Sequence, residues 1–219
     1  MTPDLPAKGE VRVVDDVAAA FATVLAEEAP AVVALSGGGT ARHCYQAVAD
    51  GSLGGTQVVF GDERWVPVED DESNEGMARR VLLDRARSGE VHSLRGAGAT
   101  REEAAGAYDQ LVASLSSLGL VHLGLGPDGH TASLFPGAAA LEVDDRLVVP
   151  TGDHAHPHPR LSLTFAGIAR ADLVVFTVAG EDKADAWRRL RSGEDLPASR
   201  VRAPRVLWLV DPAAAGNAG

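Results

Sequence analysis

Short runs of apolar residues recur along the chain, and longer stretches in which apolar positions have helical spacing separate them. The runs are rich in β-branched residues and are bounded mostly by glycine, proline or polar residues. Apolar runs that are continuous rather than alternating are typical of parallel strands covered on both faces. The pattern predicts strands at residues 31–35, 57–60, 120–125, 173–178 and 206–210.

The stretches between the runs predict helices at residues 15–28, 73–86, 100–118 and 180–190, with one more directly after the first strand. In the first helix Val17 and Phe21 fall on one face, and Asp16 is placed to cap the N-terminus. The third opens with T-R-E-E, a capping box in which Glu103 reaches back to Thr100.

The elements follow one another in the order α-β-α-β-α-α-β-α-β-α-β, which includes a helix between the third and fourth strands. Strands separated by helices need crossover connections and form parallel sheets. We therefore expect an α/β fold, a Rossmann-like, open and mostly parallel sheet with helices on both faces. Residues 1–219 are expected to form one domain with an ordered core at about 15–210. In such a sheet a ligand binds beyond the carboxyl ends of the strands.

The composition is that of a globular protein, with 45% hydrophobic and 23% charged residues. Cys44 is the single cysteine, which excludes an internal disulfide and a cysteine metal cage. The N-terminal residues contain no apolar run, and no segment reaches the ~18 apolar residues of a membrane span. We expect a soluble, cytoplasmic protein with no membrane partner.

The formal net charge of −11 makes the chain repel nucleic acid, because its basic residues form no cluster. We therefore expect no nucleic-acid partner. An anionic substrate would have to be held by a few placed cations rather than by the overall field.

Consecutive glycines follow the first predicted strand and precede a helix. Such a loop turns tightly and aims backbone N–H groups into one concavity, to which a helix start adds positive potential. The loop is therefore a candidate cradle for phosphate or carboxylate, made of Ser36, Gly37, Gly38, Gly39 and Thr40. The alternative is a glycine turn that serves close packing alone.

Charged residues directly follow the second predicted strand, in the segment G-D-E-R-W-V-P. Arg64 at this sheet edge is placed to bind a phosphate with its guanidinium fork. The alternative is a surface ion pair of Arg64 with Asp62 or Glu63, which contributes little. Whether Asp62 takes part in catalysis or only orients Arg64 stays open at this level.

An Asp, a Gly and a His follow the third predicted strand at residues 128–130. Histidine is the side chain best suited to proton transfer near neutral pH, and Asp128 is placed to hold the His130 ring in one tautomer. The alternative is an Asp-Gly turn in which His130 caps a helix.

Four motifs occur together in one order: S-G-G-G-T, F-G-D-E-R-W-V-P with S-N following, G-P-D-G-H-T-A-S-L-F-P, and G-E-D-K. The set resembles the 6-phosphogluconolactonases of the pentose phosphate pathway, which belong with the glucosamine-6-phosphate deaminases in a wider group. The resemblance covers residues 15–210 approximately, and P-D-G-H-T-A-S-L-F-P is its most specific part.

The resemblance implies an enzyme that hydrolyses 6-phosphogluconolactone without a cofactor or metal, as a monomer or weak homodimer. It implies that the substrate's phosphate lies on the 36–40 loop, with Arg64 and Lys183 completing the cradle and Arg160 contacting the substrate. It implies that His130 takes a proton from the attacking water while Asp128 orients it. A G-x-S-x-G nucleophile motif is absent from the sequence, so direct attack by water is favoured over an acyl-enzyme.

The sequence departs from the family pattern at four positions. Gly39 stands where the family usually has a second Ser, Ala41 replaces Pro, and Gly119 replaces Asp. His122 occupies an apolar strand position. The loss of a hydroxyl at Gly39 leaves more of the anion binding to backbone N–H groups.

Three other functions compete with this interpretation. A deaminase usually has Asp-Glu-Tyr where this chain has Asp-Glu-Arg, which favours the lactonase. A sugar-phosphate sensor would need no His130 and would carry a DNA-binding module. His154, His156 and His158 alternate along one segment, a spacing that could bind Zn²⁺ or Ni²⁺. A solvated loop beside the substrate entrance is favoured, because the sequence supplies no cysteine and no placed carboxylate as a further ligand.

Overall fold

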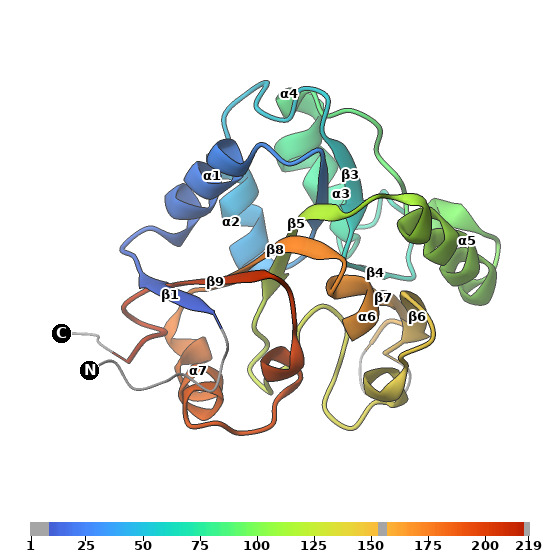
Figure 1. The fold of residues 1–219 in the computed structure, drawn as a ribbon. Coiled ribbons are helices and arrows are strands. Elements are labelled where there is room, and N and C mark those ends of the chain that lie inside the picture. The colour runs from blue at the N-terminus through green and yellow to red at the C-terminus, as the bar shows by residue number, and fades with distance from the viewer. Residues whose placement is uncertain (1–8, 153–156, 217–219) are drawn as a thin grey trace.

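The computed structural model describes residues 9–152 and 157–216 and contains a six-stranded parallel sheet (Figure 1). The five predicted strands are all present, and a sixth strand, β1, pairs with the last one. In spatial order the strands are β1 (Glu10–Val13), β9 (Arg205–Val210), β8 (Ala171–Val178), β5 (Leu118–Gly124), β2 (Val32–Leu35) and β3 (Gln57–Phe60). The predicted α/β class and the mostly parallel sheet are confirmed.

The predicted helices are also present, with bounds that differ from the prediction by a few residues. They are α1 (Val17–Glu28), α2 (Gly39–Ala47), α3 (Asn74–Ala78), which continues through the π-helical turn η1 (Arg79–Leu83) into α4 (Asp84–Ala86), then α5 (Arg101–Ser114) and η4 (Glu181–Lys183) leading into α7 (Ala184–Arg191). Both predicted caps form: Asp16 accepts from the Ala19 N–H at 2.9 Å, and Thr100 and Glu103 make the capping box. Shorter turns are η2 (Arg95–Ala97), η3 (Ala139–Glu142) and η5 (Pro197–Arg200).

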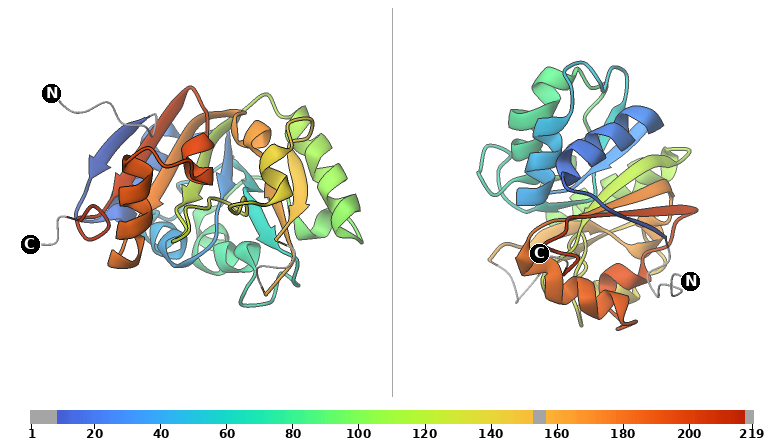
Figure 2. Two further views of the ribbon diagram at one scale, coloured as in Figure 1. Left: turned by 90° about the horizontal axis from the view of Figure 1, so that it is seen from below. Right: turned by 90° about the vertical axis from the view of Figure 1, so that its left-hand side faces the viewer.

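Helices cover both faces of the sheet, as predicted (Figure 2). On one face, the α1 residue Phe21 packs on the β5 residue His122, with ring centroids 4.2 Å apart. On the other face, the α7 residue Trp187 packs on Trp208 of β9, which stacks on Phe176 of β8 at 3.8 Å. Burial of both faces explains why these strands have continuous apolar sequences.

The prediction of a helix between the third and fourth predicted strands is wrong in its simple form. This segment contains β6 (Val148–Thr151), β7 (Arg160–Leu163) and the short helix α6 (Phe165–Ile168). Both strands join β4 (Asp62–Arg64) in a second, antiparallel sheet with the order β4-β7-β6. These strands are too short and too polar to give a clear periodic signal. Their pairing sets Arg64 opposite Arg160.

Ordered structure extends past both ends of the predicted core range. β1 precedes residue 15, and Ala214 is completely buried after the last strand. Asp211 holds this segment, because its carboxylate accepts from the N–H groups of Gly180 at 2.9 Å and Ala214 at 2.7 Å. Within the described ranges, no helix is both long and apolar enough to cross a membrane.

The strand order reverses its direction at β2, which lies between β3 and β5. The chain runs from β2 outward to β3 and later returns to the other side of β2 as β5. A crevice opens beyond the carboxyl ends of the strands at such a switch point. This crevice is where the candidate site lies.

Candidate active site

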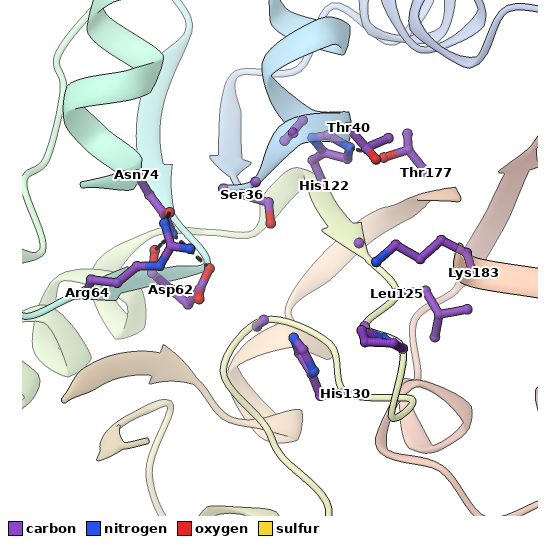
Figure 3. Close-up of a pocket in the computed structure, with 18 of the residues that line it drawn as sticks. Ser36, Thr40, Asp62, Arg64, Asn74, His122, Leu125, His130, Thr177 and Lys183 are labelled. Carbon is purple, nitrogen blue, oxygen red and sulfur yellow. Dashed lines mark hydrogen bonds between the residues drawn. The ribbon is translucent and has the colours of Figure 1, made fainter. Parts of the chain in front are cut away.

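One pocket at the carboxyl ends of β2 and β5 collects nearly all of the predicted site residues (Figure 3). Lining it are Ser36, Gly37, Gly38, Gly39, Thr40, Arg64, His130, Arg160 and Lys183. Asp128 is not part of the lining but bonds to His130 from behind. Figure 3 shows Arg64 and Lys183 on opposite sides of the pocket, with Ser36 and His130 between them.

The glycine loop is closely packed at Gly37 and lines the pocket along its length. At Gly37 a Cβ atom would lie 1.8 Å from Oδ1 of Asn74, so close packing requires glycine there. Gly38 has φ = 93°, which favours glycine, and the helix α2 begins at Gly39 without a side-chain cap. A Cβ atom at either Gly38 or Gly39 would meet open space. The first N–H groups of α2 therefore lie at the pocket, as anion binding requires.

Arg64 does not form the ion pair with Asp62 or Glu63 that the alternative interpretation expects. Its Nη1 donates to the backbone oxygen of Glu72 and to Oδ1 of Asn74, both at 2.8 Å. The nearest carboxylate contact is from Nη2 to Glu72 at 4.0 Å. These contacts hold the guanidinium at the pocket wall, where the contact with Glu72 is its one ion pair among the described residues.

Two further cations face the same space. Nη1 of Arg160 lies 4.0 Å from Asp62, and burial lowers the pKa of Arg160, which the Asp62 charge opposes. Lys183 Nζ lies 3.0 Å from Asp182, and Figure 3 shows its amine pointing into the pocket. Nε of Arg160 and of Arg64 are buried without a hydrogen-bond partner among the described residues. Among the described residues that line the pocket, three cations face one carboxylate, Asp62, so this lining favours an anion.

Asn74 and Ser133 join the site although the sequence pattern gives them no role. Ser133 Oγ donates to one oxygen of Asp62 at 2.6 Å, and Nδ2 of Asn74 donates to the other at 3.1 Å. Oδ1 of Asn74 also accepts a hydrogen bond from the Arg64 guanidinium. Asn74 therefore links Asp62, Arg64 and the glycine loop. The available signal is the S-N pair of the family motif, in which Ser73 caps helix α3.

Glu63 ties strand β4 to the start of α3. Its two oxygens accept from the backbone N–H groups of Arg64 at 2.7 Å, Asn74 at 2.8 Å and Glu75 at 2.8 Å, and from the Ser73 hydroxyl at 3.0 Å. Burial raises the pKa of Glu63 to about 6, against the effect of these donors. Glu63 thereby places Arg64 and Asn74 without lining the pocket itself.

His130 and Asp128 form the predicted pair. His130 Nδ1 lies 2.5 Å from Asp128 Oδ1, which also accepts the His130 backbone N–H at 3.1 Å. Burial alone would raise the pKa of Asp128, but the bonds and the charge of His130 outweigh it and lower that pKa. An ionised Asp128 at Nδ1 keeps the proton of a neutral ring on this nitrogen, and Nε2 is then the nitrogen that accepts one.

The residues around His130 leave space for its imidazole ring and pack against it. A Cβ atom at Gly126 would lie 2.1 Å from His130 Nδ1, so only glycine leaves room for the imidazole. The Phe135 ring packs on the other side with centroids 4.7 Å apart. Thr131 pairs with Leu134 directly after His130, so His130 does not cap a helix and that part of the alternative is wrong. The Asp-Gly turn itself is present, with the Gly129 N–H donating to the Gly126 carbonyl oxygen at 2.9 Å.

Two further sequence features are Cys44 and the His-rich segment at residues 154–158. Burial raises the pKa of Cys44 to about 12, so the thiol stays protonated and is a poor nucleophile. His154 and His156 of the His-rich segment lie outside the described residues. Among residues 9–152 and 157–216, no group of three His, Cys, Asp or Glu side chains is placed to hold a metal ion.

His122 is completely buried in β5, where both ring nitrogens have partners. Nδ1 lies 2.9 Å from the Tyr45 hydroxyl and Nε2 lies 2.9 Å from the Thr177 hydroxyl. Burial lowers the pKa of His122 to about 3. The ring is therefore neutral in the folded protein at physiological pH.

The buried His122 predicts a loss of stability in mild acid. Below its ordinary pKa of about 6.5 the unfolded chain binds a proton at His122, whereas the folded chain does so only near pH 3. Stability therefore falls as the pH drops, by about 2 kcal/mol at pH 5 from this group. Urea unfolding of the wild type and His122→Leu at pH 7 and pH 5 measures this contribution. Equal losses in both proteins would show that folded His122 does titrate.

Comparison with known proteins agrees with the resemblance that the motifs indicate. A sequence model of the family described as glucosamine-6-phosphate isomerases/6-phosphogluconolactonase matches residues 7–208. A 6-phosphogluconolactonase from Synechocystis is 38% identical over 210 residues, which cover 88% of this chain and 87% of that protein.

Solved structures share the fold. The 6-phosphogluconolactonase from Thermotoga maritima superposes with a TM-score of 0.82 at 27% identity, covering 93% of this chain and 100% of that one. A monomeric glucosamine-6-phosphate deaminase also gives 0.82, at 22% identity and with 95% and 99% coverage, which is a likeness of fold alone. With a family match over most of its length and a relative at 38% identity, this chain belongs to the glucosamine-6-phosphate isomerase/6-phosphogluconolactonase family.

Proposed function

We propose that this protein hydrolyses 6-phospho-D-glucono-1,5-lactone to 6-phosphogluconate, with His130 as the general base. The observation that carries the proposal is that His130, which is paired with Asp128, lines the same pocket as three cationic side chains. A proton acceptor beside an anion site suits an ester that carries a phosphate. Named lactonases at up to 38% identity support the choice of substrate.

The phosphate is held by the 36–40 loop and by charge. The N–H groups at the start of α2 donate to phosphate oxygens, and Lys183 and Arg64 supply positive charge from opposite sides. Arg160 contacts the substrate nearer to β7, where the Asp62 carboxylate orients it at 4.0 Å. These contacts leave the lactone carbonyl directed toward His130.

Hydrolysis then proceeds by direct attack of water. His130 Nε2 takes a proton from the water as its oxygen bonds to the lactone carbonyl carbon, and Asp128 stabilises the imidazolium that forms. The carbonyl oxygen becomes an oxyanion, which nearby donors and cations stabilise. As the carbonyl re-forms, the bond to the ring oxygen breaks and this oxygen takes the proton back from His130. The products are a carboxylic acid, which ionises, and a hydroxyl group.

Lys183→Ala tests the phosphate site. The variant loses a charge-assisted contact with the phosphate, so we expect KM for the phosphorylated lactone to rise about 10- to 100-fold. Turnover of plain glucono-1,5-lactone, which has no phosphate, is expected to stay unchanged. Initial rates on both lactones, corrected for spontaneous hydrolysis, give the comparison. An equal effect on both substrates would argue against a phosphate contact of Lys183.

Gly39→Ser tests the loop by adding a hydrogen-bond donor, whereas Lys183→Ala removes a contact. A Cβ atom at Gly39 meets open space at the first position of α2, so a serine fits and adds a hydroxyl donor at the pocket. One added hydrogen bond is expected to lower KM for the phosphorylated lactone about two- to tenfold. The matched variant Gly39→Ala separates the hydroxyl from the effect of the Cβ atom. The expectation fails if both variants change KM alike.

A further inference from the structure

A chain of buried hydrogen bonds runs beneath the pocket from the loop after β2 to the end of β8. It connects Ser36 to Tyr45 in α2, Tyr45 to His122 in β5, and His122 to Thr177 in β8. Tyr45 and His122 are completely buried, and Thr177 is nearly so. Figure 3 shows His122 and Thr177 side by side at the pocket. The proposed mechanism uses none of the three buried side chains.

The Tyr45 hydroxyl fixes the first residue of the phosphate loop. β2 ends at Leu35, so the backbone groups of Ser36 lie beyond its ladder of hydrogen bonds. The Ser36 N–H donates to Tyr45 Oη at 2.7 Å, and this hydroxyl lies 3.2 Å from the Ser36 carbonyl oxygen. A single phenol thus contacts both backbone groups at the point where the chain enters the loop.

His122 in turn fixes the phenol. In one proton arrangement Tyr45 donates to Nδ1, and Nε2 donates to Thr177. In the other, Nδ1 donates to Tyr45, the phenol donates to the Ser36 carbonyl, and Thr177 donates to Nε2. The imidazole keeps two hydrogen bonds in both arrangements, and Phe21 holds its plane from 4.2 Å away.

The position of this series of hydrogen bonds indicates which part of the protein it supports. A side chain between two covered faces is normally apolar, because a buried imidazole must recover its desolvation cost through hydrogen bonds. The two side chains that bond to His122 connect it to the two parts of the proposed phosphate site. Tyr45 bonds to the first residue of the loop, and Thr177 is the penultimate residue of β8, which precedes the segment that carries Lys183.

We propose that His122 is a positioning residue that holds the 36–40 loop, through Tyr45, in register with the end of β8, through Thr177. The inference rests on the proposed function, because it takes the loop and Lys183 to be the phosphate site. When these hydrogen bonds are lost, the 36–40 loop and the segment that carries Lys183 move apart. Phosphate affinity then falls, while His130, on the other side of the pocket, keeps its geometry.

The test compares Tyr45→Phe and His122→Leu with a matched control. Tyr108→Phe removes a phenol that is buried to the same degree and that likewise accepts a backbone N–H at a strand end, from Phe60 at 2.8 Å. The Tyr108 hydroxyl donates to the His92 carbonyl oxygen and makes no bond to the 36–40 loop or to His122. Titration calorimetry gives the Kd for inorganic phosphate. Steady-state kinetics gives KM and kcat for the phosphorylated lactone.

We expect Kd and KM to rise about five- to tenfold in Tyr45→Phe and His122→Leu, with kcat within about twofold of wild type, because only binding contacts are lost. Tyr108→Phe should leave Kd and KM unchanged. Unchanged Kd in both test variants, or an equal rise in the control, would overturn the inference. Wild type that fails to bind phosphate would overturn it too. Wild type that binds phosphate but does not hydrolyse the lactone would remove the proposed function, and Kd alone would then decide the positioning role.

Discussion

Replacing His130 with alanine is expected to lower kcat for lactone hydrolysis by about 10²- to 10⁴-fold, the usual contribution of a general acid–base group. The ring lines the same pocket as the three cations, and Asp128 lies 2.5 Å from its Nδ1. KM should change little, because the phosphate contacts come from other elements. Rates over a range of lactone concentrations separate the two parameters.

The stability of His130→Ala is the control for this prediction. The His130 side chain is 27% exposed, so its removal takes little from the core and the melting temperature should fall by only a few degrees. A melting temperature that falls in parallel with activity would show that the loss of turnover reflects unfolding. A variant that is folded and fully active would remove His130 from the mechanism.

The second large effect is expected at a residue that has no side chain. In Gly126→Ala the new methyl group would lie about 2 Å from the Nδ1 and Cε1 atoms of His130, so the ring must move. A misplacement of about 1 Å in a catalytic group costs on the order of 10²-fold in rate. We expect a loss of kcat of that size without loss of phosphate affinity.

A double variant isolates the cause of the Gly126→Ala effect. Once His130 is alanine, the space next to residue 126 is free and the methyl group has nothing to displace. Adding Gly126→Ala to His130→Ala should therefore cost almost no further activity, which is a strongly non-additive result. Additive losses would mean that the methyl group acts on the substrate or on the backbone instead of on the ring.

The strands of the parallel sheet are predictable because each is covered on both faces. β5 and β8 are continuous apolar runs, and even the exception in β5, His122, is visible in the sequence as a break in the pattern. Caps are local, which is why Asp16 and Thr100 are predicted correctly. The small antiparallel sheet is not predictable in this way. β4 has the sequence D-E-R and pairs with β7, far along the chain, so nothing local identifies it.

The same distinction applies to the site. Residues that directly follow parallel strands must meet at one sheet edge, so Ser36, Arg64, His130 and Lys183 can be brought together from the sequence alone. Asn74 reaches the pocket from a helix that follows a loop. Asn74 and Ser133 are brought to Asp62 only by the packing of separate elements, which no periodicity records.

The most direct test of the central claim is the hydrolysis of freshly generated 6-phosphogluconolactone by the wild type, followed against the spontaneous reaction. We predict a rate that increases in proportion to enzyme concentration and saturates with lactone, while glucosamine 6-phosphate releases no ammonia in a parallel assay. A lactone rate equal to the spontaneous one, together with release of ammonia from glucosamine 6-phosphate, would contradict the account and assign the site to the other activity of its family.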